Sequence, residues 1–355
     1  MMHQQALDQT AALSTAAPAI PLSTLHKLAS GLYGIDGEVT VLAGERDQNC
    51  RIDGQDGMRH VLKISNPSEE PTVVDFQIAA LEHIAVVAPE LPIPRVVRTL
   101  GGRTSERIRL DDGNVCTVRM LTYLDGVQIK ETIRTAGQRR AMGSGLAKLN
   151  LALRDFSHPG AHHDLLWNVS TAHRLAAKME GLIDPGRRLL AQRFMTRFEQ
   201  DVLPLLPQVR TQVIHNDYHL YNVLVAPQEQ EHITGIIDFG DMLHAPLVGE
   251  VGTAAAFHMT GNTDPFEGPA QLVGAYHALL PLTDPEQEIV TDLMATRHLI
   301  TALISEWRAA RYPHNRAYIM RHNPAAWEAL GQLADLSRQD ARDRLLSEIR
   351  NRRIP

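Results

Sequence analysis

The segment VIHNDYHLYNVLV, residues 213–225, places His215, Asp217, His219 and Asn222 between two apolar, β-branched runs. Valine and isoleucine favour extended backbone, so the polar cluster is expected in a loop between two short buried strands. Polar groups in such a place require hydrogen-bond partners or a chemical use. The segment therefore constrains the fold and the function together, and it allows three interpretations.

The first interpretation is a zinc site. His215 and His219 are four residues apart, which on a helix would place both imidazoles on one face, as in the HExxH motif. However, Asn216 stands where that motif needs a glutamate, and the flanking residues predict strands. Metal analysis of the protein would test this metallohydrolase hypothesis.

The second interpretation is a structural loop whose His and Asn side chains bond to the backbone. The third depends on spacing, because His215-x-Asp217-x-x-x-x-Asn222 matches the H-x-D-x-x-x-x-N spacing of a kinase catalytic loop. Asp238, in IIDFGD, follows Asn222 by sixteen residues after one turn, as the metal-binding Asp of a kinase would. Two linked motifs in the correct order favour this third interpretation.

Phosphoryl transfer needs a carboxylate that orients the attacking hydroxyl and oxygen ligands that hold Mg²⁺ on the phosphates. Asp217 is predicted to be the catalytic carboxylate. Asn222 and Asp238 are predicted to be the metal ligands, side by side if their strands pair as a hairpin. His215 is predicted to support the loop by bonding to its backbone.

The rest of the chain predicts two lobes. Strand patterns with glycine-rich turns occupy residues 38–64, a helical pattern covers 73–87, and two further strand candidates precede Gly126. Helical patterns dominate afterwards, including 136–155, 285–310 and 324–350. We therefore predict an α+β protein with three parts: a mobile tail (1–29), a nucleotide-binding N-lobe (30–122) and a helical catalytic C-lobe (123–355).

With these motifs, the chain resembles the aminoglycoside phosphotransferase and choline kinase superfamily, the protein-kinase-like small-molecule kinases. The resemblance covers about 30–350. It implies a bilobal protein-kinase-like fold, with a small antiparallel sheet and one main helix in the N-lobe and a larger, mainly helical C-lobe. It also implies an O-phosphotransferase that uses Mg²⁺ and ATP or GTP, while main-chain recognition of the base leaves the choice of nucleotide open.

The resemblance also implies nucleotide-binding residues in the N-lobe. Lys63 in HVLKIS matches the strand lysine that holds the phosphates, although a lysine guarding an edge strand is the structural alternative. Gly44 and Asn49 lie where a nucleotide-covering turn is expected, with ordinary turn chemistry as the alternative. Met120 and Tyr123 fall in the segment expected to contact the base through main-chain groups.

One position departs from the family pattern. Gln77 stands where most members carry the glutamate that pairs with the strand lysine, and Glu82 lies nearby on another helical face. Either Gln77 or Glu82 is expected to partner Lys63. Glu250 matches a family acid that is expected to brace the catalytic loop, although a charge at a helix N-terminus is the alternative.

Several C-lobe features resemble the hydroxylysine kinase branch, including HHDLLWN and SEWRAARYPHNRAYI. A 5-hydroxylysine-like acceptor is therefore favoured, with aminoglycoside, choline or homoserine kinases, or a catalytically silent nucleotide-binding module, as alternatives. Carboxylates are expected to bind the acceptor's ammonium groups, and arginines to bind any carboxylate it carries. The candidates are Asp164, Asp241 and Glu306 for ammonium groups, Arg308 or Arg311 for a carboxylate, and Trp167 or Trp307 for cation–π contact.

Composition narrows the remaining classes. The net charge of −6 with mixed signs argues against a nucleic-acid partner, and no apolar run approaches the ~20 residues that span a bilayer. Two cysteines without CxxC spacing support neither a disulfide framework nor a four-thiolate metal site. With no signal-like N-terminus, these features favour a cytoplasmic protein without membrane attachment and leave its oligomeric state open.

Overall fold

The computed structural model describes residues 17–44, 46–110, 113–260 and 263–351. Backbone contacts divide the chain into two compact units. The first contains the described residues up to Gly126 together with 156–164 and 234–240, and the second contains 127–155, 165–233 and the described residues from Asp241 onward. The first unit therefore includes two short segments from later in the sequence, which no single predicted boundary anticipates.

The predicted N-terminal tail is only partly open to comparison, because residues 1–16 lie outside the described chain. From Leu22 the prediction does not hold, since Leu22–Tyr33 forms helix α2. Leu25, Ala29 and Tyr33 are spaced four residues apart, so they share one helical face, and all three are buried. Burial of this face against the sheet orders a segment whose small polar residues suggested mobility.

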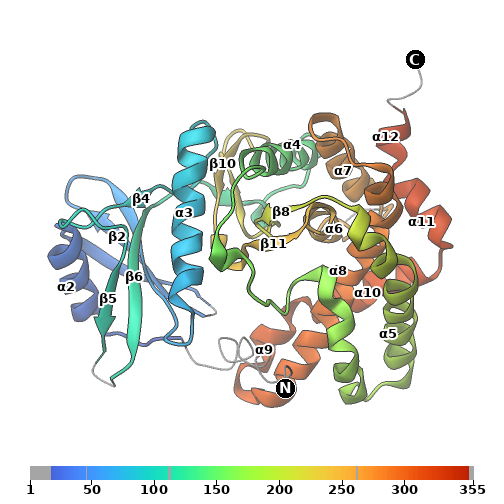
Figure 1. Ribbon diagram of the computed structural model, residues 1–355, viewed down its shortest axis with the longest axis horizontal. Helices are drawn as coiled ribbons and strands as arrows, with labels where there is room; N and C mark the ends of the chain where they lie inside the picture. The colour runs from blue at the N-terminus through green and yellow to red at the C-terminus, as the bar shows by residue number, and fades with distance from the viewer. Residues whose placement is uncertain (1–16, 45, 111–112, 261–262, 352–355) are drawn as a thin grey trace. The chain divides into compact units, whose positions relative to one another are not determined.

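The first unit is built on an antiparallel sheet with strand order β1-β2-β3-β6-β4, in which β5 also pairs with β6 (Figure 1). The predicted strands at 38–64 and before Gly126 are confirmed. The strands are β1 (Gly37–Leu42), β2 (Gln48–Gly54), β3 (Arg59–Ile64), β4 (Val96–Val97), β5 (Glu106–Arg109) and β6 (Val115–Thr122).

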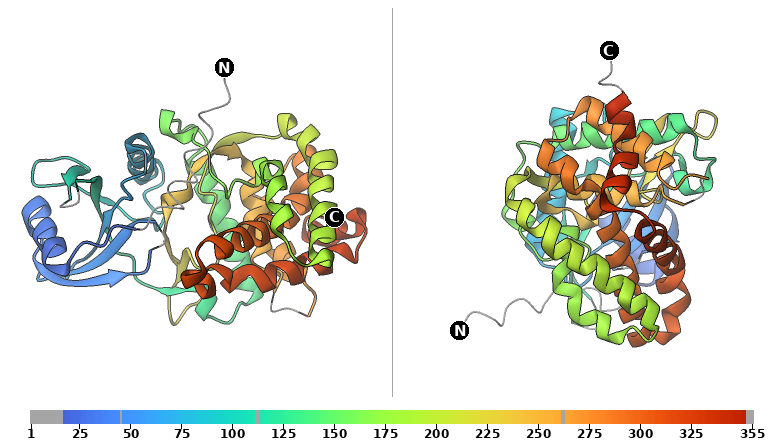
Figure 2. Two further views of the ribbon diagram at one scale, coloured as in Figure 1. Left: turned by 90° about the horizontal axis from the view of Figure 1, so that it is seen from below. Right: turned by 90° about the vertical axis from the view of Figure 1, so that its right-hand side faces the viewer.

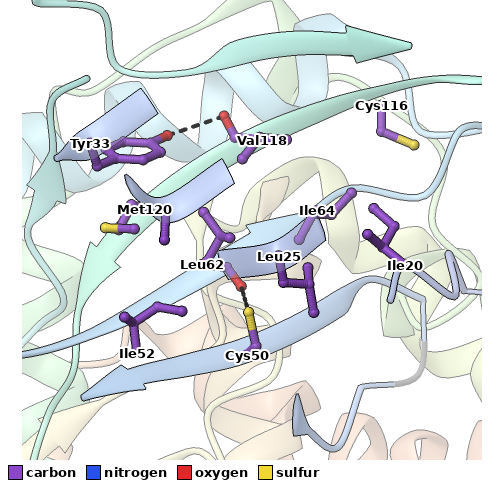
Figure 3. Packing of buried hydrophobic residues seen from close by; sticks show 11 residues of the cluster. Ile20, Leu25, Tyr33, Cys50, Ile52, Leu62, Ile64, Cys116, Val118 and Met120 are labelled. Atoms are coloured by element: carbon purple, nitrogen blue, oxygen red, sulfur yellow. Dashed lines mark hydrogen bonds between the residues drawn. The ribbon is translucent and has the colours of Figure 1, made fainter. Parts of the chain in front are cut away.

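One face of this sheet forms the core of the first unit with α2 (Figure 3). Alternation along the strands sends Cys50, Leu62 and Met120 to this face, where they lie directly opposite one another in the strand register. The Tyr33 hydroxyl donates to the Val118 carbonyl at 3.5 Å. Because α2 covers this apolar face, the polar residues of the same strands are on the other face.

The predicted helix at 73–87 is confirmed as α3 (Pro71–Val87), with proline in its first turn, where a missing N–H costs nothing. Phe76 of α3 is fully buried, and its ring stacks on that of Phe156. The first unit also contains most of strand β10 (Ile233–Ile236) and a 3₁₀ helix at Pro159–Ala161.

The second unit is mainly helical, with helices that pack against one another (Figure 2). The predicted helices at 136–155 and 285–310 are confirmed as α4 (Ala136–Ala152) and α8 (Asp284–Arg311). Two short strand pairs, β7 (Val127–Gln128) with β9 (Val223–Val225) and β8 (Thr211–Ile214) with β11 (Leu243–Pro246), flank the polar loop. The other α-helices up to α9 are α5 (Pro185–Arg197), α6 (Leu247–Ala256), α7 (Glu267–Leu279) and α9 (Arg316–Ile319).

The C-terminal segment 324–350 is helical as predicted, but it divides into three helices. Ser337 caps α11 by accepting from the Asp340 backbone N–H, so a new helix starts there. The three are α10 (Asn323–Ala334), α11 (Arg338–Leu345) and α12 (Ser347–Asn351). None of the helices in the described ranges has the length and hydropathy needed to cross a membrane.

Irregular and tighter helices complete the second unit. The longest lies at Val169–Gly181 and packs against α8. With the sheet in the first unit and the helices in the second, the predicted α+β class is confirmed. The remaining short helices of this unit are Ile129–Glu131, Phe198–Val202, Leu203–Gln208, Pro313–Asn315 and Met320–His322. A further short helix, Phe239–Asp241, has its first two residues in the first unit.

Candidate active site

A row of polar side chains crosses the sheet of the first unit. Asn49 of β2 lies opposite Lys63 of β3, which lies opposite Arg119 of β6. Residues directly opposite one another in antiparallel strands point to the same face, so these three side chains are neighbours. Because side chains alternate between the two faces of a strand, the residues next to the apolar ones that pack against α2 point to the opposite face, and three of them form this row.

Lys63 occupies the middle of this row on a central strand, so the alternative of a lysine guarding an edge is wrong. Its side chain is only 14% exposed, and its Nζ lies 3.9 Å from Oδ1 of Asp238. A mostly buried ammonium group is costly without anionic partners. The first unit thus contains both the predicted phosphate-binding lysine and one predicted metal ligand.

Asp238 has a left-handed backbone, with φ of 62°, and its side chain is 56% exposed. Non-glycine residues adopt this conformation uncommonly, although Asp does so more readily than most, and such residues cluster at functional sites. The exposed carboxylate makes a long ion pair with Lys63. It therefore keeps most of its capacity to bind a further cation.

Gln77 does not occupy the role expected from the family glutamate. Its Oε1 accepts from an Arg119 nitrogen at 2.7 Å, and its Nε2 donates to the Gly240 carbonyl at 3.2 Å. A glutamate could make the first contact but not the second, because a carboxylate has no N–H to donate. Glu82 pairs instead with Arg98 at the surface, at 2.6 Å. Gln77 thus connects the row of polar side chains to the segment that follows Asp238.

The other nucleotide-binding candidates have mixed outcomes. An added Cβ at Gly44 would collide with the Asp47 carbonyl oxygen, so local packing by itself accounts for glycine there. Asn49 has a buried Oδ1 without a hydrogen-bond partner.

The two residues expected to contact the base already use main-chain groups. Met120 is buried and is paired with both β3 and β4, which engages its main chain in the sheet. Tyr123 already donates its N–H to the Arg59 carbonyl.

Asp217, in the second unit, is held by three side chains. Its Oδ1 lies 3.1 Å from His219 Nε2 and 3.2 Å from an Arg297 nitrogen. Its Oδ2 accepts from Asn222 Nδ2 at 2.8 Å. Burial by itself would raise the pKa of Asp217, but His219, Arg297 and His215 outweigh burial and hold the pKa well below its usual range. The carboxylate is therefore ionised and fixed in one orientation.

The backbone around Asp217 is held by hydrogen bonds to the side chains of Glu250 and His215. Asn216 has a left-handed conformation with φ of 65°, which asparagine tolerates better than most residues where the family pattern has glycine. The buried Glu250 accepts the Asn216 N–H at 2.9 Å and the Asn150 side-chain amide at 2.5 Å. His215 Nδ1 accepts the Asp217 N–H at 3.3 Å. Burial raises the pKa of Glu250 to about 7, although these hydrogen bonds lower it.

His219, which the sequence suggested only as a zinc ligand, contacts the predicted catalytic carboxylate. Its Nδ1 accepts the Tyr221 backbone N–H at 3.3 Å, which leaves Nε2 to carry the proton and donate to Asp217. His215 Nδ1 and both ring nitrogens of His219 make contacts within this loop. In the described part of the chain, no group of three or more His, Cys, Asp or Glu side chains is placed to hold a metal ion.

The predicted acceptor-binding residues are largely engaged elsewhere. Glu306 pairs with Arg187 at 3.1 Å, and the Trp307 ring already contacts two cations, Lys178 at 3.7 Å and Arg311 at 4.4 Å. Asp164 is exposed and belongs to the first unit. Asp241 is the acidic candidate that acts electrostatically on Arg297, and thus lies near the Asp217 group.

A cavity of about 110 Å³ lies in the second unit beside the Asp217 group. It is lined by residues that follow Asp217 in its loop and by side chains from α6, α8 and α10. Arg297 belongs both to this lining and to the hydrogen bonds of Asp217. The other lining residues are Leu220, Tyr221, Ala256, Phe257, Thr260, His298, Thr301, His322, Ala325 and Ala326.

Two arginines of the site were not predicted from the sequence. Arg297 lies in the middle of α8, eighty residues after Asp217, and its role depends on tertiary packing. Arg119 could have been found, because the register that places Lys63 on the polar face places its β6 neighbour there too. A charged residue inside the apolar run VCTVRML was the available signal.

Comparison with known proteins agrees with this geometry. A profile of the phosphotransferase enzyme family matches residues 38–288. The mouse (Mus musculus) hydroxylysine kinase is 27% identical over 349 residues, covering 92% of each chain, and the Bos taurus hydroxylysine kinase is 26% identical, covering 79% of this chain and 78% of the relative.

Solved structures show the same fold. An amicoumacin kinase, solved with AMP-PNP, Ca²⁺ and amicoumacin, superposes with a TM-score of 0.66 at 16% identity, covering 86% of this chain and 93% of that one. A microcompartment-associated aminopropanol kinase superposes with a TM-score of 0.65 at 18% identity, covering 86% and 98%. The chain belongs to the phosphotransferase enzyme family, and it is a phosphotransferase that acts on a hydroxyl group of a small molecule.

Proposed function

We propose that this chain is a nucleotide- and Mg²⁺-dependent kinase whose acceptor is the hydroxyl group of 5-hydroxylysine or a close analogue. The observation that carries the proposal is the fixed, ionised Asp217 beside a cavity in the second unit. The hydroxylysine kinases, which match over most of the chain, favour this acceptor over aminoglycoside, choline and homoserine.

Asp217 is suited to orient an acceptor hydroxyl rather than to be a strong base. A carboxylate with a depressed pKa holds a proton weakly, but phosphoryl transfer passes through a loose transition state that asks mainly for positioning. His219, Arg297 and Asn222 hold both carboxylate oxygens in place. The hydroxyl proton would pass to Asp217 as the new bond from the acceptor oxygen to the γ-phosphorus forms and the bond from that phosphorus to the β,γ-bridging oxygen breaks, with the nucleoside diphosphate as leaving group.

Lys63 is suited to bind the phosphates of the nucleotide, with Asn49 and Arg119 beside it in the polar row. Each of these side chains presents donors to one face of the sheet, and phosphate oxygens accept several at once. The half-buried Asn49 and the buried Arg119 each have a buried atom without a partner, Oδ1 and one terminal nitrogen respectively. For Arg119 this nitrogen would find a partner in a phosphate oxygen.

Asn222 and Asp238 would hold Mg²⁺. The amide nitrogen of Asn222 already donates to Asp217, which leaves its oxygen as the acceptor, and the Asp238 carboxylate is more than half exposed. Amide and carboxylate oxygens fit the preference of Mg²⁺ for oxygen, with one or two protein ligands beside the phosphates. When bound, Mg²⁺ neutralises charge on the phosphates.

The test is a nucleotide-consumption panel of purified protein, in which ATP and GTP are each combined with 5-hydroxylysine, choline, homoserine and kanamycin. The expected result is phosphorylation of 5-hydroxylysine with the highest kcat/KM, and no phosphorylation by the Asp217→Asn variant. A higher kcat/KM with another compound would make that compound the proposed acceptor in place of 5-hydroxylysine. Consumption no higher than in the Asp217→Asn variant with every acceptor would contradict the proposal.

A further inference from the structure

Two residues that line the cavity beside Asp217 each have a buried side-chain nitrogen atom without a hydrogen-bond partner. These atoms are Nε of Arg297 and Nε2 of His298, consecutive residues of α8 that both line the cavity. Their side chains are almost completely buried. An unpartnered donor in such a place costs free energy, so a ligand group that bonds to it is favoured.

The charge of the cavity lining selects the kind of ligand. Arg297 is the one permanently charged side chain in that lining, and no Asp or Glu belongs to the part of it that the structure describes. Burial lowers the pKa of both lining histidines, His298 and His322, to about 4, with neighbouring arginines adding to the effect. Both are therefore neutral near pH 7. Although Asp217 pairs with Arg297 at 3.2 Å, the described lining itself offers a cation and no carboxylate, so it favours an anion over an ammonium group.

Arg297 can bind an anion without releasing Asp217. One of its terminal nitrogens donates to Asp217 at 3.2 Å, and the other lies 3.5 Å from the Trp167 carbonyl. Its ring contacts, with Trp167 at 5.1 Å and Phe257 at 5.6 Å, fix the plane of the guanidinium. The remaining Nε is then free to donate to a second anion in a fixed direction.

We propose that Arg297 and His298 form a carboxylate subsite, so that the enzyme selects hydroxylated amino acids over amino alcohols that lack a carboxylate. This inference deepens the proposed function and rests on it for the position of the acceptor hydroxyl at Asp217. It also replaces the expectation that Arg308 or Arg311 binds the carboxylate. Arg311 stacks on Trp307, and neither residue belongs to the cavity lining in the described chain.

The first experiment does not depend on phosphoryl transfer. Binding of L-lysine and of cadaverine, which is lysine without its carboxylate, is measured by calorimetry in the presence of ADP and Mg²⁺. We expect L-lysine to bind about 10- to 100-fold more tightly, the usual range for one buried charge-assisted interaction. Equal affinities, or no binding of L-lysine, would overturn the subsite.

The second experiment compares turnover of 5-hydroxylysine with turnover of 1,5-diaminopentan-2-ol, its decarboxylated analogue. The expected preference for 5-hydroxylysine is again about 10- to 100-fold in kcat/KM, mostly through KM. If L-lysine binds as expected but neither alcohol is phosphorylated, the proposed acceptor is wrong and the carboxylate subsite stands. If both alcohols react equally, the kinase function stands and the subsite is wrong.

Variants separate recognition of the carboxylate from support of Asp217. Arg297→Gln is expected to lower turnover of both alcohols, because Asp217 loses a donor, but also to remove the preference between them. A purely structural role of Arg297 would lower both rates and leave their ratio unchanged. His298→Ala does not touch Asp217 and is expected to reduce the ratio with a smaller loss of kcat.

Arg308→Gln is the matched control, since Arg308 is a buried arginine of the same helix outside the cavity lining. The ratio of its kcat/KM for 5-hydroxylysine to that for 1,5-diaminopentan-2-ol should equal the wild-type ratio. A collapse of the ratio in Arg308→Gln but not in Arg297→Gln would move the carboxylate to Arg308 and contradict the assignment.

Discussion

Asp217 and Asp238 both match aspartates of the kinase motifs, yet their environments differ. Asp217 is 19% exposed and bonds to three side chains, whereas Asp238 is 56% exposed and lies 3.9 Å from Lys63 Nζ. Both belong to segments with a left-handed residue, Asn216 and Asp238 itself. The protein therefore fixes one carboxylate fully and leaves the other available.

The difference matches the proposed ligand of each carboxylate, a neutral hydroxyl at Asp217 and a metal ion with a nucleotide at Asp238. An acceptor hydroxyl is neutral and brings no charge to organise the site, so the protein itself must hold Asp217 in position. A nucleotide with its metal brings strong charges that can order an exposed carboxylate on binding. We therefore expect substitutions around Asp217 to affect kcat, and those around Asp238 and Lys63 to affect nucleotide binding.

The largest expected effect comes from Asp217→Asn. The amide cannot accept the hydroxyl proton, so kcat should fall by about 10³-fold, within the usual range for loss of an acid or base group. Nucleotide affinity, measured by calorimetry with ADP, should remain near that of the wild type. Unchanged kcat, or an equally large loss of ADP affinity, would remove the functional distinction between the two carboxylates.

The next effect is expected from Lys63→Met, which removes the ammonium group from the polar row. Because a buried charged hydrogen bond contributes about 1.5–3 kcal/mol, kcat/KM for the nucleotide should fall about 10- to 100-fold. KM for the acceptor should change little. Lys27→Met, on the exposed surface of α2, is the matched control and should retain wild-type kinetics. A loss confined to acceptor KM would contradict the assignment of Lys63.

Glu250 should make stability depend on pH. Its pKa is raised from 4.5 to about 7 in the folded state, so the folded protein binds its proton more tightly than the unfolded chain. This stabilisation is complete below about pH 4.5 and is lost as pH rises through 7, on the order of 1–3 kcal/mol. Urea unfolding at pH 5 to 8 should therefore show a steeper decline for wild type than for Glu250→Gln. Parallel curves would refute the raised pKa.

The smallest effect is expected from Gln77→Glu, which restores the residue found in most of the family. The new carboxylate keeps the contact with Arg119 but faces the Gly240 carbonyl without a proton to donate. The loss of one hydrogen bond should raise nucleotide KM by about fivefold. Glu82→Gln on the same helix should have no effect. If Gln77→Glu instead lowered KM, a Lys63 partnership would be the better interpretation.

Much of this arrangement was predictable because it is local in sequence. The strands at 38–64, helix α3, the loop around Asp217 and the position of Lys63 all follow from alternation, helical spacing and motif spacing. The register of β3 determines the face on which Lys63 lies, and short-range pattern is enough to determine that register.

What could not be predicted depends on contacts between distant segments. Arg297 reaches Asp217 from α8, and Gln77 bonds to Gly240, 163 residues away. Glu306 and Trp307 were attractive by residue type but are paired with Arg187 and Lys178, which only packing reveals. His219 was set aside with the zinc hypothesis, although its short distance in sequence from Asp217 allowed the contact.

The polar row in the sheet gives the β2–β3 turn an unexpected importance. Asn49, Lys63 and Arg119 share a face only because the turn after Gly54 has the length that pairs Asn49 with Lys63. Insertion of a single residue in this turn would shift one strand against the next and invert its faces. If the polar row binds the nucleotide as proposed, the length of this turn decides whether the row forms, and natural or engineered insertions there should be rare among active variants.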